Sequence, residues 1–369
     1  MNQPSNFQPN WVSVPGNTIN DILKQKNISF ENFANIINKD INYIRKLILG
    51  DVLITPELAK KLEDNLGATS NFWLKRESQY RESINRLTSH EEEKWLKELP
   101  VREMKKLGWI SDIKYSANNF FAFFDVSDIW AWKSKYRDLV KSTSFRSSYT
   151  FDSNFLSVCT WLRKGEIESN KIECKKFDPI LFKQQLFEIK KLIKRKHPKD
   201  FINELKVLCA ECGVAVSLVP TPKGCTASGA TRAMDNDRIM LLLSFRYLSD
   251  DHFWFTFFHE AGHILLHDKG NLFIEEDGHD GLDSVEEKEA NNFSSNMLIP
   301  NNEREKLKNI PLTKVGIVKF AVTNGISPGI VVGQLQNAGV IGFHQLNFYK
   351  RRYNWSEILS SNDANHPTK

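Results

Sequence analysis

The sequence predicts an α+β protein that is mostly helical, and three observations lead to this fold class. Apolar residues recur at helical spacing, between helix caps, over residues 15 to about 75. Two short runs, Val214–Val219 and Arg238–Phe245, have the composition of strands, and a loop rich in Gly, Ser and Thr, Gly224–Thr231, is expected between them. Long helical segments follow. We therefore expect a small β-sheet in an otherwise helical chain.

The length of 369 residues favours more than one domain. We expect a five-helix domain over 11–87, a helical connector over 95–176 and a domain containing the sheet over 178–350. The predicted boundaries are two polar stretches, Thr88–Lys94 and Lys164–Lys176.

Residues Ser29 to Gly50 have the length and apolar spacing of a helix-turn-helix. Ser29 and Asp40 are residue types that cap helix N-termini. Asn38 falls at the turn, where a left-handed backbone is expected and asparagine is tolerated. Ala34 is small where two helices would pack closely. These residues predict a helix pair inside a set of short helices.

The remaining helices of this region are also marked by capping residues. Thr55-Pro56 is a cap followed by proline at the first helical position. Gly67 is expected to close that helix, and Ser70 to start a fifth one.

The second helix of the pair carries side chains that would point at DNA base edges, namely Asn42, Tyr43, Arg45 and Lys46. Double-stranded DNA at an operator or promoter is therefore an expected partner. The alternative is a five-helix interaction module that does not contact DNA.

Bulk composition restricts the other function classes. Lys and Arg number 50 against 45 Asp and Glu, and this net charge of +5 permits an acidic partner without demonstrating one. Cys209 and Cys212 form a single CxxC, so a ribbon-type zinc site, which needs a second pair, is not expected. No signal peptide and no apolar run of about 20 residues is visible. We expect a cytoplasmic protein without a membrane partner.

His259-Glu-Ala-Gly-His263 is an HExxH motif. Residues at i and i+4 share one face of a helix, so both imidazoles can reach one metal ion. Glu260 lies one position round the helix, where it can touch a water molecule at the metal. The alternative is a helix with two incidental histidines. The other histidines of this region, His267, His279 and His344, are more often ordinary polar residues.

A catalytic zinc ion takes three protein ligands and one water. Glu287, on a downstream helix, is the expected third ligand, and Glu286 and Glu289 are competing choices. Asn291, one turn further on, could hold a ligand by a hydrogen bond.

Three motifs in order resemble the ImmA/IrrE family of zinc metallopeptidases. They are Ala227-Ser-Gly-Ala-Thr-Arg232, the helix Phe255–His267 that contains HExxH, and Glu287–Pro300. The last departs from the family pattern at Ser294-Ser295, where alanines are usual, and at Asn296-Met297. The resemblance covers about residues 200 to 345.

This resemblance implies a gluzincin-like fold, with zinc held by His259, His263 and Glu287 and with Glu260 as the general base. A segment such as Ala227–Arg232, if it forms or borders the sheet edge, could align an extended peptide by backbone hydrogen bonds. The oxyanion needs a donor besides zinc, and the candidates are Arg232, Tyr247 and His267.

The N-terminal region resembles the XRE (Cro/cI-type) family and, within it, the HigA-type antitoxins. The phrases that carry the resemblance are Ser29-Phe-Glu-Asn-Phe-Ala34, Ile54-Thr-Pro56 and Asn71-Phe-Trp-Leu74, and it covers about 11–85. Phe30 replaces a polar residue that usually contacts phosphate. Ile41 is apolar in a region that normally faces DNA. The resemblance implies that this region binds an operator. The two departures could weaken that binding or redirect the region to a protein partner.

Two functions therefore compete. The first is a DNA-binding regulator with a zinc endopeptidase that cleaves a repressor or a toxin-antitoxin-related protein. The second is a non-proteolytic HigA-like antitoxin or repressor in which zinc is structural or sensory. A protein substrate or toxin partner is expected, and a homodimer is one assembly open to the chain.

Overall fold

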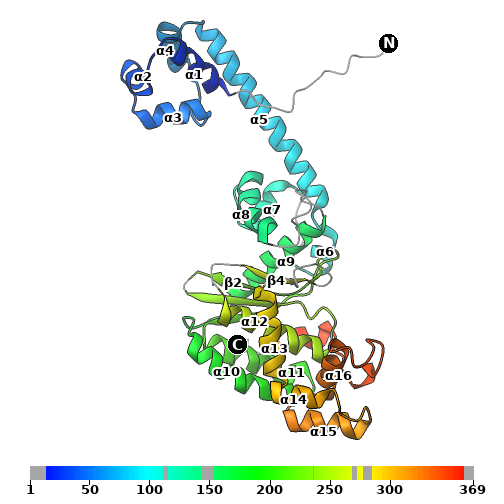
Figure 1. Cartoon of the computed structure of the whole chain (residues 1–369). Coiled ribbons are helices and arrows are strands. Elements are labelled where there is room, and N and C mark those ends of the chain that lie inside the picture. Colours follow the sequence, from blue (N-terminus) through cyan, green and yellow to red (C-terminus); the bar gives the residue numbers. More distant parts are fainter. Residues whose placement is uncertain are drawn as a thin grey trace, which may run out of the picture. The chain divides into compact units, whose positions relative to one another are not determined.

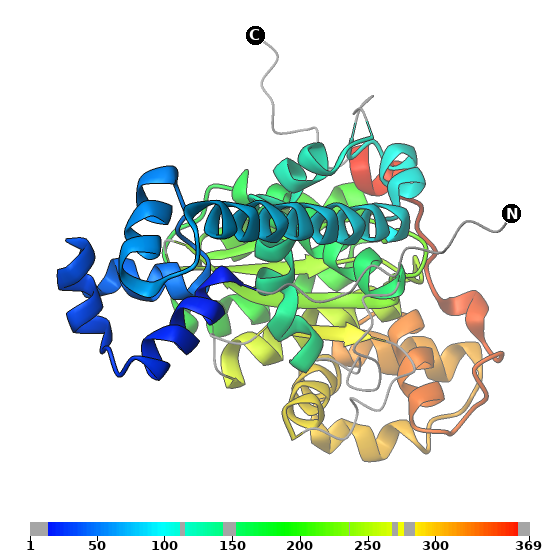
Figure 2. The same cartoon turned by 90° about the horizontal axis from the view of Figure 1, so that it is seen from above.

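The computed structural model describes residues 14–110, 115–142, 153–235, 237–267, 272–276 and 285–360. Contacts divide the chain into two compact units, Met1–Lys97 and Glu98–Lys369. The elements of both are drawn in Figures 1 and 2. None of the described helices is by itself long and apolar enough to span a bilayer. One pair of helices, α15 (Lys314–Asn324) and α16 (Pro328–Asn337), passes the same test jointly but is bent by 102°.

The described residues of the first unit form five helices: α1 (Pro15–Gln25), α2 (Phe30–Ile37), α3 (Ile41–Leu49), α4 (Pro56–Leu66) and α5 (Ser70–Glu98). Their apolar faces meet in one core, whose fully buried members include Ile19, Phe33, Ile44, Leu62 and Trp73. Burial of these side chains, rather than intrinsic helix propensity, is what stabilises such short helices.

The expected caps of the helix pair are present. The Ser29 hydroxyl accepts a hydrogen bond from the Asn32 N–H at 3.2 Å, and the Asp40 carboxylate accepts one from the Tyr43 N–H at 2.8 Å. Asn38 has the left-handed backbone that was expected, with φ of 57°. The boundaries of α2 and α3 predicted from the sequence are therefore confirmed.

The polar stretch Thr88–Lys94, predicted as a linker, lies inside the continuous helix α5, which ends where contacts divide the two units. The stretch is polar, but it contains no Gly or Pro and is rich in Glu, which is a good helix former. An i,i+4 ion pair between Glu93 and Lys97 at 2.7 Å adds local support. The polarity of this stretch therefore does not indicate the end of a helix.

The second unit begins with helices that precede the sheet: α6 (Val101–Lys106), α7 (Ala117–Phe124), α8 (Ile129–Ser142), α9 (Ser153–Asn170), α10 (Pro179–Lys191), the short η2 (Leu192–Lys194) and α11 (Pro198–Ala210). The later helices are α12 (Asp250–Leu266), α13 (Val285–Leu298), α14 (Asn301–Leu307), α15 (Lys314–Asn324), α16 (Pro328–Asn337), the short η4 (Asn347–Tyr349) and α17 (Trp355–Ser360).

Over the part of the chain that the structure describes, the sheet has four strands in the order β1-β3-β2-β4. They are β1 (Val214–Leu218), β2 (Ala227–Met234), β3 (Arg238–Leu243) and β4 (Phe273–Glu276). β1 and β3 are parallel, whereas β2 runs antiparallel to both β3 and β4. The two strands expected from the sequence are confirmed, and the mostly helical α+β class is observed.

The loop expected between these strands is wrong, because most of it forms β2. Its Gly, Ala and Ser residues have low strand propensity, which hid the strand. Gly229 and Ala230 are buried, and an added Cβ at Gly229 would clash with the Glu260 side chain. Small residues are thus required where helix α12 lies close to the strand.

Helices cover both faces of this sheet (Figure 1). On one face, Gly165 of α9 packs directly on Leu242 of β3. On the other, Leu241 and Leu243 join the main core with Phe257 of α12. The predicted boundary Lys164–Lys176 therefore begins inside α9, and contacts group the predicted connector with the sheet in one unit.

Helix α12 begins in a buried polar network. Ser249 does not cap it through its side chain. Its hydroxyl instead bonds to Asp251, which also pairs with Lys350 Nζ at 2.6 Å. Asp250 accepts hydrogen bonds from the Ser327 hydroxyl at 2.6 Å and the Arg351 N–H at 3.0 Å. The network ties the start of α12 to α16 and to the C-terminal segment.

We expect Asp250→Asn to gain stability relative to the wild type as pH rises from about 4 to 7. Burial raises the pKa of Asp250 from 3.8 to about 6. The hydrogen bond from Ser327 lowers this pKa but only partly offsets the effect of burial. Stability associated with the protonated carboxyl is present below the unfolded pKa and is lost as pH rises through the folded one. The relative gain is on the order of 2–3 kcal/mol.

Urea unfolding of both proteins at several pH values measures this difference. The same substitution at the exposed Asp237 is the control. Stability profiles of Asp250→Asn and wild type that stay parallel over this range would contradict the expectation.

Candidate metal centre

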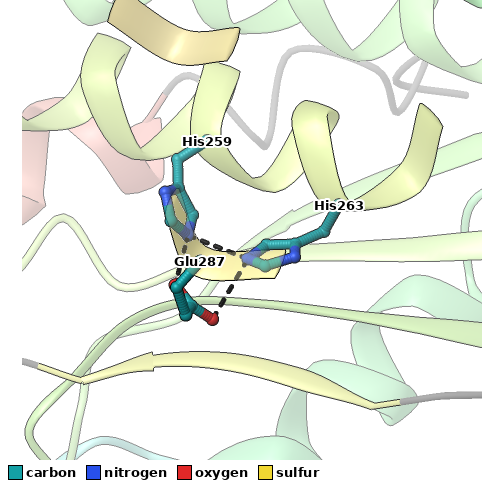
Figure 3. A group of neighbouring side chains, drawn as sticks. All are labelled: His259, His263 and Glu287. Atoms are coloured by element: carbon teal, nitrogen blue, oxygen red, sulfur yellow. Dashed lines mark hydrogen bonds and ion pairs between the residues drawn. The ribbon is translucent and has the colours of Figure 1, made fainter. Parts of the chain in front are cut away.

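His259 and His263 lie one helical turn apart on α12 and are almost completely buried, with 1% and 2% of their surfaces exposed. Their Nε2 atoms are 2.9 Å apart and point to the same place (Figure 3). The i,i+4 spacing brings the two rings together, as the sequence predicted.

Glu287 reaches this place from the first turn of α13. One carboxylate oxygen lies 3.2 Å from His259 Nε2 and the other 3.3 Å from His263 Nε2 (Figure 3). Within the described part of the chain, these three residues are the one group of His, Cys, Asp or Glu found with ligand atoms close enough to share an ion. Of the acidic candidates, Glu289 instead contacts His267, and Glu286 is outside the cluster.

The donor set fits zinc. Two ligand atoms bound to a tetrahedral zinc ion at about 2.0–2.1 Å lie about 3.3 Å apart. The distances from Glu287 to the histidines match this spacing, and the distance between the histidines is slightly shorter. Two imidazoles and one carboxylate are also the ligand types of many catalytic zinc sites.

The protonation of the cluster suits metal binding. Burial lowers the pKa of His263, which favours the neutral imidazole needed by a ligand. Burial alone would raise the pKa of Glu287, but its contacts with His259 and His263 outweigh this and lower the pKa to about 2. A neutral imidazole at His263 and an ionised carboxylate at Glu287 both present lone pairs to a metal ion.

Glu260 is fully buried between α12 and β2. A Cβ added at Gly229 would lie 2.3 Å from the Glu260 Oε1 atom and 2.7 Å from its Cγ. The absence of a side chain at Gly229 therefore leaves room for the carboxylate of Glu260, the residue that follows His259 on α12. The sequence contains this glycine in a recognisable motif, but nothing in the pattern says what it packs against.

The outer nitrogens of both histidines also have partners. Asn291 Oδ1 lies 3.1 Å from His259 Nδ1, where a hydrogen bond to a ligand was expected. His267 Nδ1 lies 3.0 Å from His263 Nδ1, and its Nε2 lies 3.0 Å from Glu289. The contact through His267 was not anticipated.

Further contacts hold the helices around the cluster. The ring of Phe273, on β4, stacks on His263 with centroids 4.4 Å apart. Gly262 allows close approach of α13, since an added Cβ would lie 3.1 Å from Ala290 Cα. The Ser294 hydroxyl, where an alanine is usual in the resembled pattern, donates to the Phe255 carbonyl at 2.8 Å. This serine therefore forms a satisfied link between the two helices.

The candidate oxyanion donors are placed differently from one another. Arg232 pairs with Glu166 of α9 at 2.6 Å, and strand alternation puts it on the face of β2 opposite Gly229. His267 lies on the outer side of His263. Tyr247 contacts His252 near the start of α12, with ring centroids 4.2 Å apart. His279 lies outside the described residues.

The segment Ala227–Arg232 is not at the edge of the sheet. Its strand β2 pairs with β3 on one side and with β4 on the other. Among the described strands, β4 is the outermost next to the metal-site helices. An incoming peptide could therefore pair with β4 but not directly with β2.

The side chains expected to contact DNA all lie on α3 of the first unit. Asn42, Arg45 and Lys46 are exposed, and Tyr43 is half-buried with Lys39 Nζ 5.0 Å from its ring centre. Phe30 packs against the core of this unit, which accounts for an apolar residue at that position.

Residues 222–320 match the family model of the IrrE N-terminal-like domain, a metallopeptidase family. This range contains β2, β3, the HExxH helix α12, β4 and the Glu287 helix α13. The match supports an ImmA/IrrE-type domain in the second unit, and the family implies a metal, generally zinc. No curated protein matched the chain.

Proposed function

We propose that this chain is a DNA-binding regulator whose second unit is a zinc-dependent endopeptidase acting on a repressor or a toxin-antitoxin-related protein. The observation that carries the peptidase part is Glu260. Its buried carboxylate lies against Gly229, and Glu260 directly follows His259, one of the three residues that could share a metal ion. A purely structural zinc site has no use for such a base.

Each residue has a defined task in this proposal. His259, His263 and Glu287 hold zinc, which when bound supplies a Lewis acid for carbonyl and water activation. Glu260 takes a proton from the attacking water and passes it to the leaving amine as the peptide bond breaks. Asn291 orients His259 through the Nδ1 contact.

The outer edge of β4 is the proposed docking line for an extended substrate. An unpaired strand edge offers backbone N–H and C=O groups to a peptide. β4 also carries Phe273, which lies on the ring of His263, so a peptide at this edge would pass close to the metal ligands.

The test is Glu260→Gln, which keeps the shape of the side chain but removes the base. We expect the variant to retain zinc while cleavage falls by about 10²–10⁴. A pull-down with this variant should trap an uncut protein that the wild type does not retain. If cells carrying Glu260→Gln regulate the target genes and partner levels as wild-type cells do, proteolysis is not the function.

One observation favours a second candidate, a non-proteolytic repressor or antitoxin with a structural or sensory zinc. Glu260, His259 and His263 are all closed to solvent, with at most 2% of their surfaces exposed. In this case Glu260→Gln would leave regulation unchanged, whereas removal of the zinc ligands would alter it. The two variants together separate the candidates.

The DNA-binding part predicts that Arg45→Ala/Lys46→Ala weakens binding to the promoter region of the protein's own gene. Binding itself should fall steeply with salt, because phosphate neutralisation contributes to it. Gel shifts at several salt concentrations measure both effects, with Lys60→Ala/Lys61→Ala on α4 as a charge-matched control. If wild-type protein shows no preference for this promoter over random DNA at low salt, the operator proposal is wrong.

A further inference from the structure

We propose that His267 and Glu289 form an outer chain that positions His263 for zinc. The inference rests on the proposed metal site and concerns residues beyond its ligands. His267 is the first residue after α12, and Glu289 lies on α13 two residues after Glu287. The chain runs from His263 Nδ1 to His267 Nδ1 at 3.0 Å, and from His267 Nε2 to Glu289 Oε2 at 3.0 Å.

The direction of these hydrogen bonds follows from proton counting. His263 directs Nε2 toward Glu287 and the metal position, so a neutral His263 must carry its proton on Nδ1. That N–H donates to His267 Nδ1. The proton of a neutral His267 is then on Nε2, where it donates to the Glu289 carboxylate. Every donor in the chain has one acceptor, and the chain ends on a negative charge.

The surroundings favour this chain over an incidental surface contact. The His267 side chain is only 6% exposed, while that of Glu289 is 53% exposed. The ring of Phe273 flanks both His263 and His267, with centroids 4.4 and 5.4 Å away. The chain therefore links a buried ligand to a carboxylate at the surface through one sheltered imidazole.

The consequence for the metal site is twofold. A hydrogen bond at Nδ1 fixes the ring orientation and the tautomer of a ligating histidine and increases the basicity of Nε2. Helix α13 would then supply a partner for each histidine, Asn291 for His259 and Glu289, through His267, for His263. His267 is thus a positioning residue, and not the oxyanion donor considered from the sequence.

The test measures the affinity of the full chain for Zn²⁺ alone, by competition with a chromophoric chelator. We expect His267→Ala to weaken binding by about 10–100-fold, and Glu289→Gln by an amount near the lower end of that range. His267→Gln can accept from His263 and donate to Glu289, so it should restore most of the affinity. Glu286→Gln removes the same charge from the same helix without this contact, and should leave affinity unchanged.

A second readout does not depend on stability. In the zinc-loaded protein, the Nδ1 proton of His263 should give a slowly exchanging imidazole resonance, and this resonance should be lost in His267→Ala. Wild-type affinity in His267→Ala, no rescue by His267→Gln, or equal effects of Glu289→Gln and Glu286→Gln would each overturn the proposal. If His259→Ala/His263→Ala still binds zinc normally, the metal site itself fails. If that variant loses zinc while His267→Ala does not, only the outer chain is refuted.

Discussion

Replacing both His259 and His263 with alanine is expected to abolish stoichiometric zinc binding. The substitution removes two of the three ligand atoms that converge within 4.8 Å and leaves Glu287 alone. The affinity for zinc should fall by more than about 10–100-fold, which is the usual effect of removing a residue that hydrogen-bonds to a metal ligand. Wild-type protein should carry close to one zinc per chain, as measured by elemental analysis after dialysis.

Thermal unfolding gives an independent measure of the same event. A ligand that binds only the folded state raises its melting temperature by mass action, so added zinc should stabilise the wild type and not the double variant. His344→Ala, on an exposed loop of the same unit, is the matched control and should respond to zinc as the wild type does. Zinc retained by His259→Ala/His263→Ala with unchanged affinity would remove the basis for a metal centre here.

The first unit was predictable because its signals are local. Ser29 and Asp40 cap helices that begin within the next residue, and Asn38 adopts the left-handed conformation that asparagine tolerates. Each signal acts over three or four residues and needs no knowledge of distant contacts. At Thr88–Lys94 the helix itself was not predicted, since polarity indicates exposure but not the end of a helix.

In the second unit, long-range packing decides what the sequence leaves open. β2 was taken for a loop because Gly229 and Ala230 are poor strand formers, and their small size becomes meaningful only when α12 lies against them. The histidine pair of α12 follows from helical spacing alone. The choice of Glu287 over Glu286 and Glu289 depends on how α13 crosses α12, which no local pattern specifies.

The sequence analysis also did not predict on which face of the sheet Arg232 lies, because β2 was not expected to be a strand. Arg232 was one of three unranked candidates for the oxyanion donor, with Tyr247 and His267. Once β2 is a strand, alternation places Arg232 on the side of α9, where it pairs with Glu166. A residue near the site in sequence can thus be separated from it by the thickness of a sheet.

The variant Gly229→Ala is expected to reduce cleavage nearly as much as Glu260→Gln, by about 10²–10⁴, if its effect is to displace the general base. The added Cβ would lie 2.3 Å from Glu260 Oε1 and within 2.8 Å of two of its carbon atoms, so the carboxylate must move. Overpacking of this kind also costs about 1–3 kcal/mol of stability. Zinc should remain bound, because the three atoms nearest to the added Cβ all belong to Glu260 and not to a ligand.

A double-variant cycle separates displacement of Glu260 from general damage to the fold. The substrate is the protein trapped by Glu260→Gln, and cleavage is compared among the wild type, both single variants and Gly229→Ala/Glu260→Gln. If Gly229→Ala acts through Glu260, the double variant should be no slower than Glu260→Gln, since residues in contact are not additive. Two outcomes would contradict this expectation: the double variant loses activity by the product of the two single losses, or Gly229→Ala is fully active. Either would mean that the packing of Glu260 against β2 does not determine its role in cleavage.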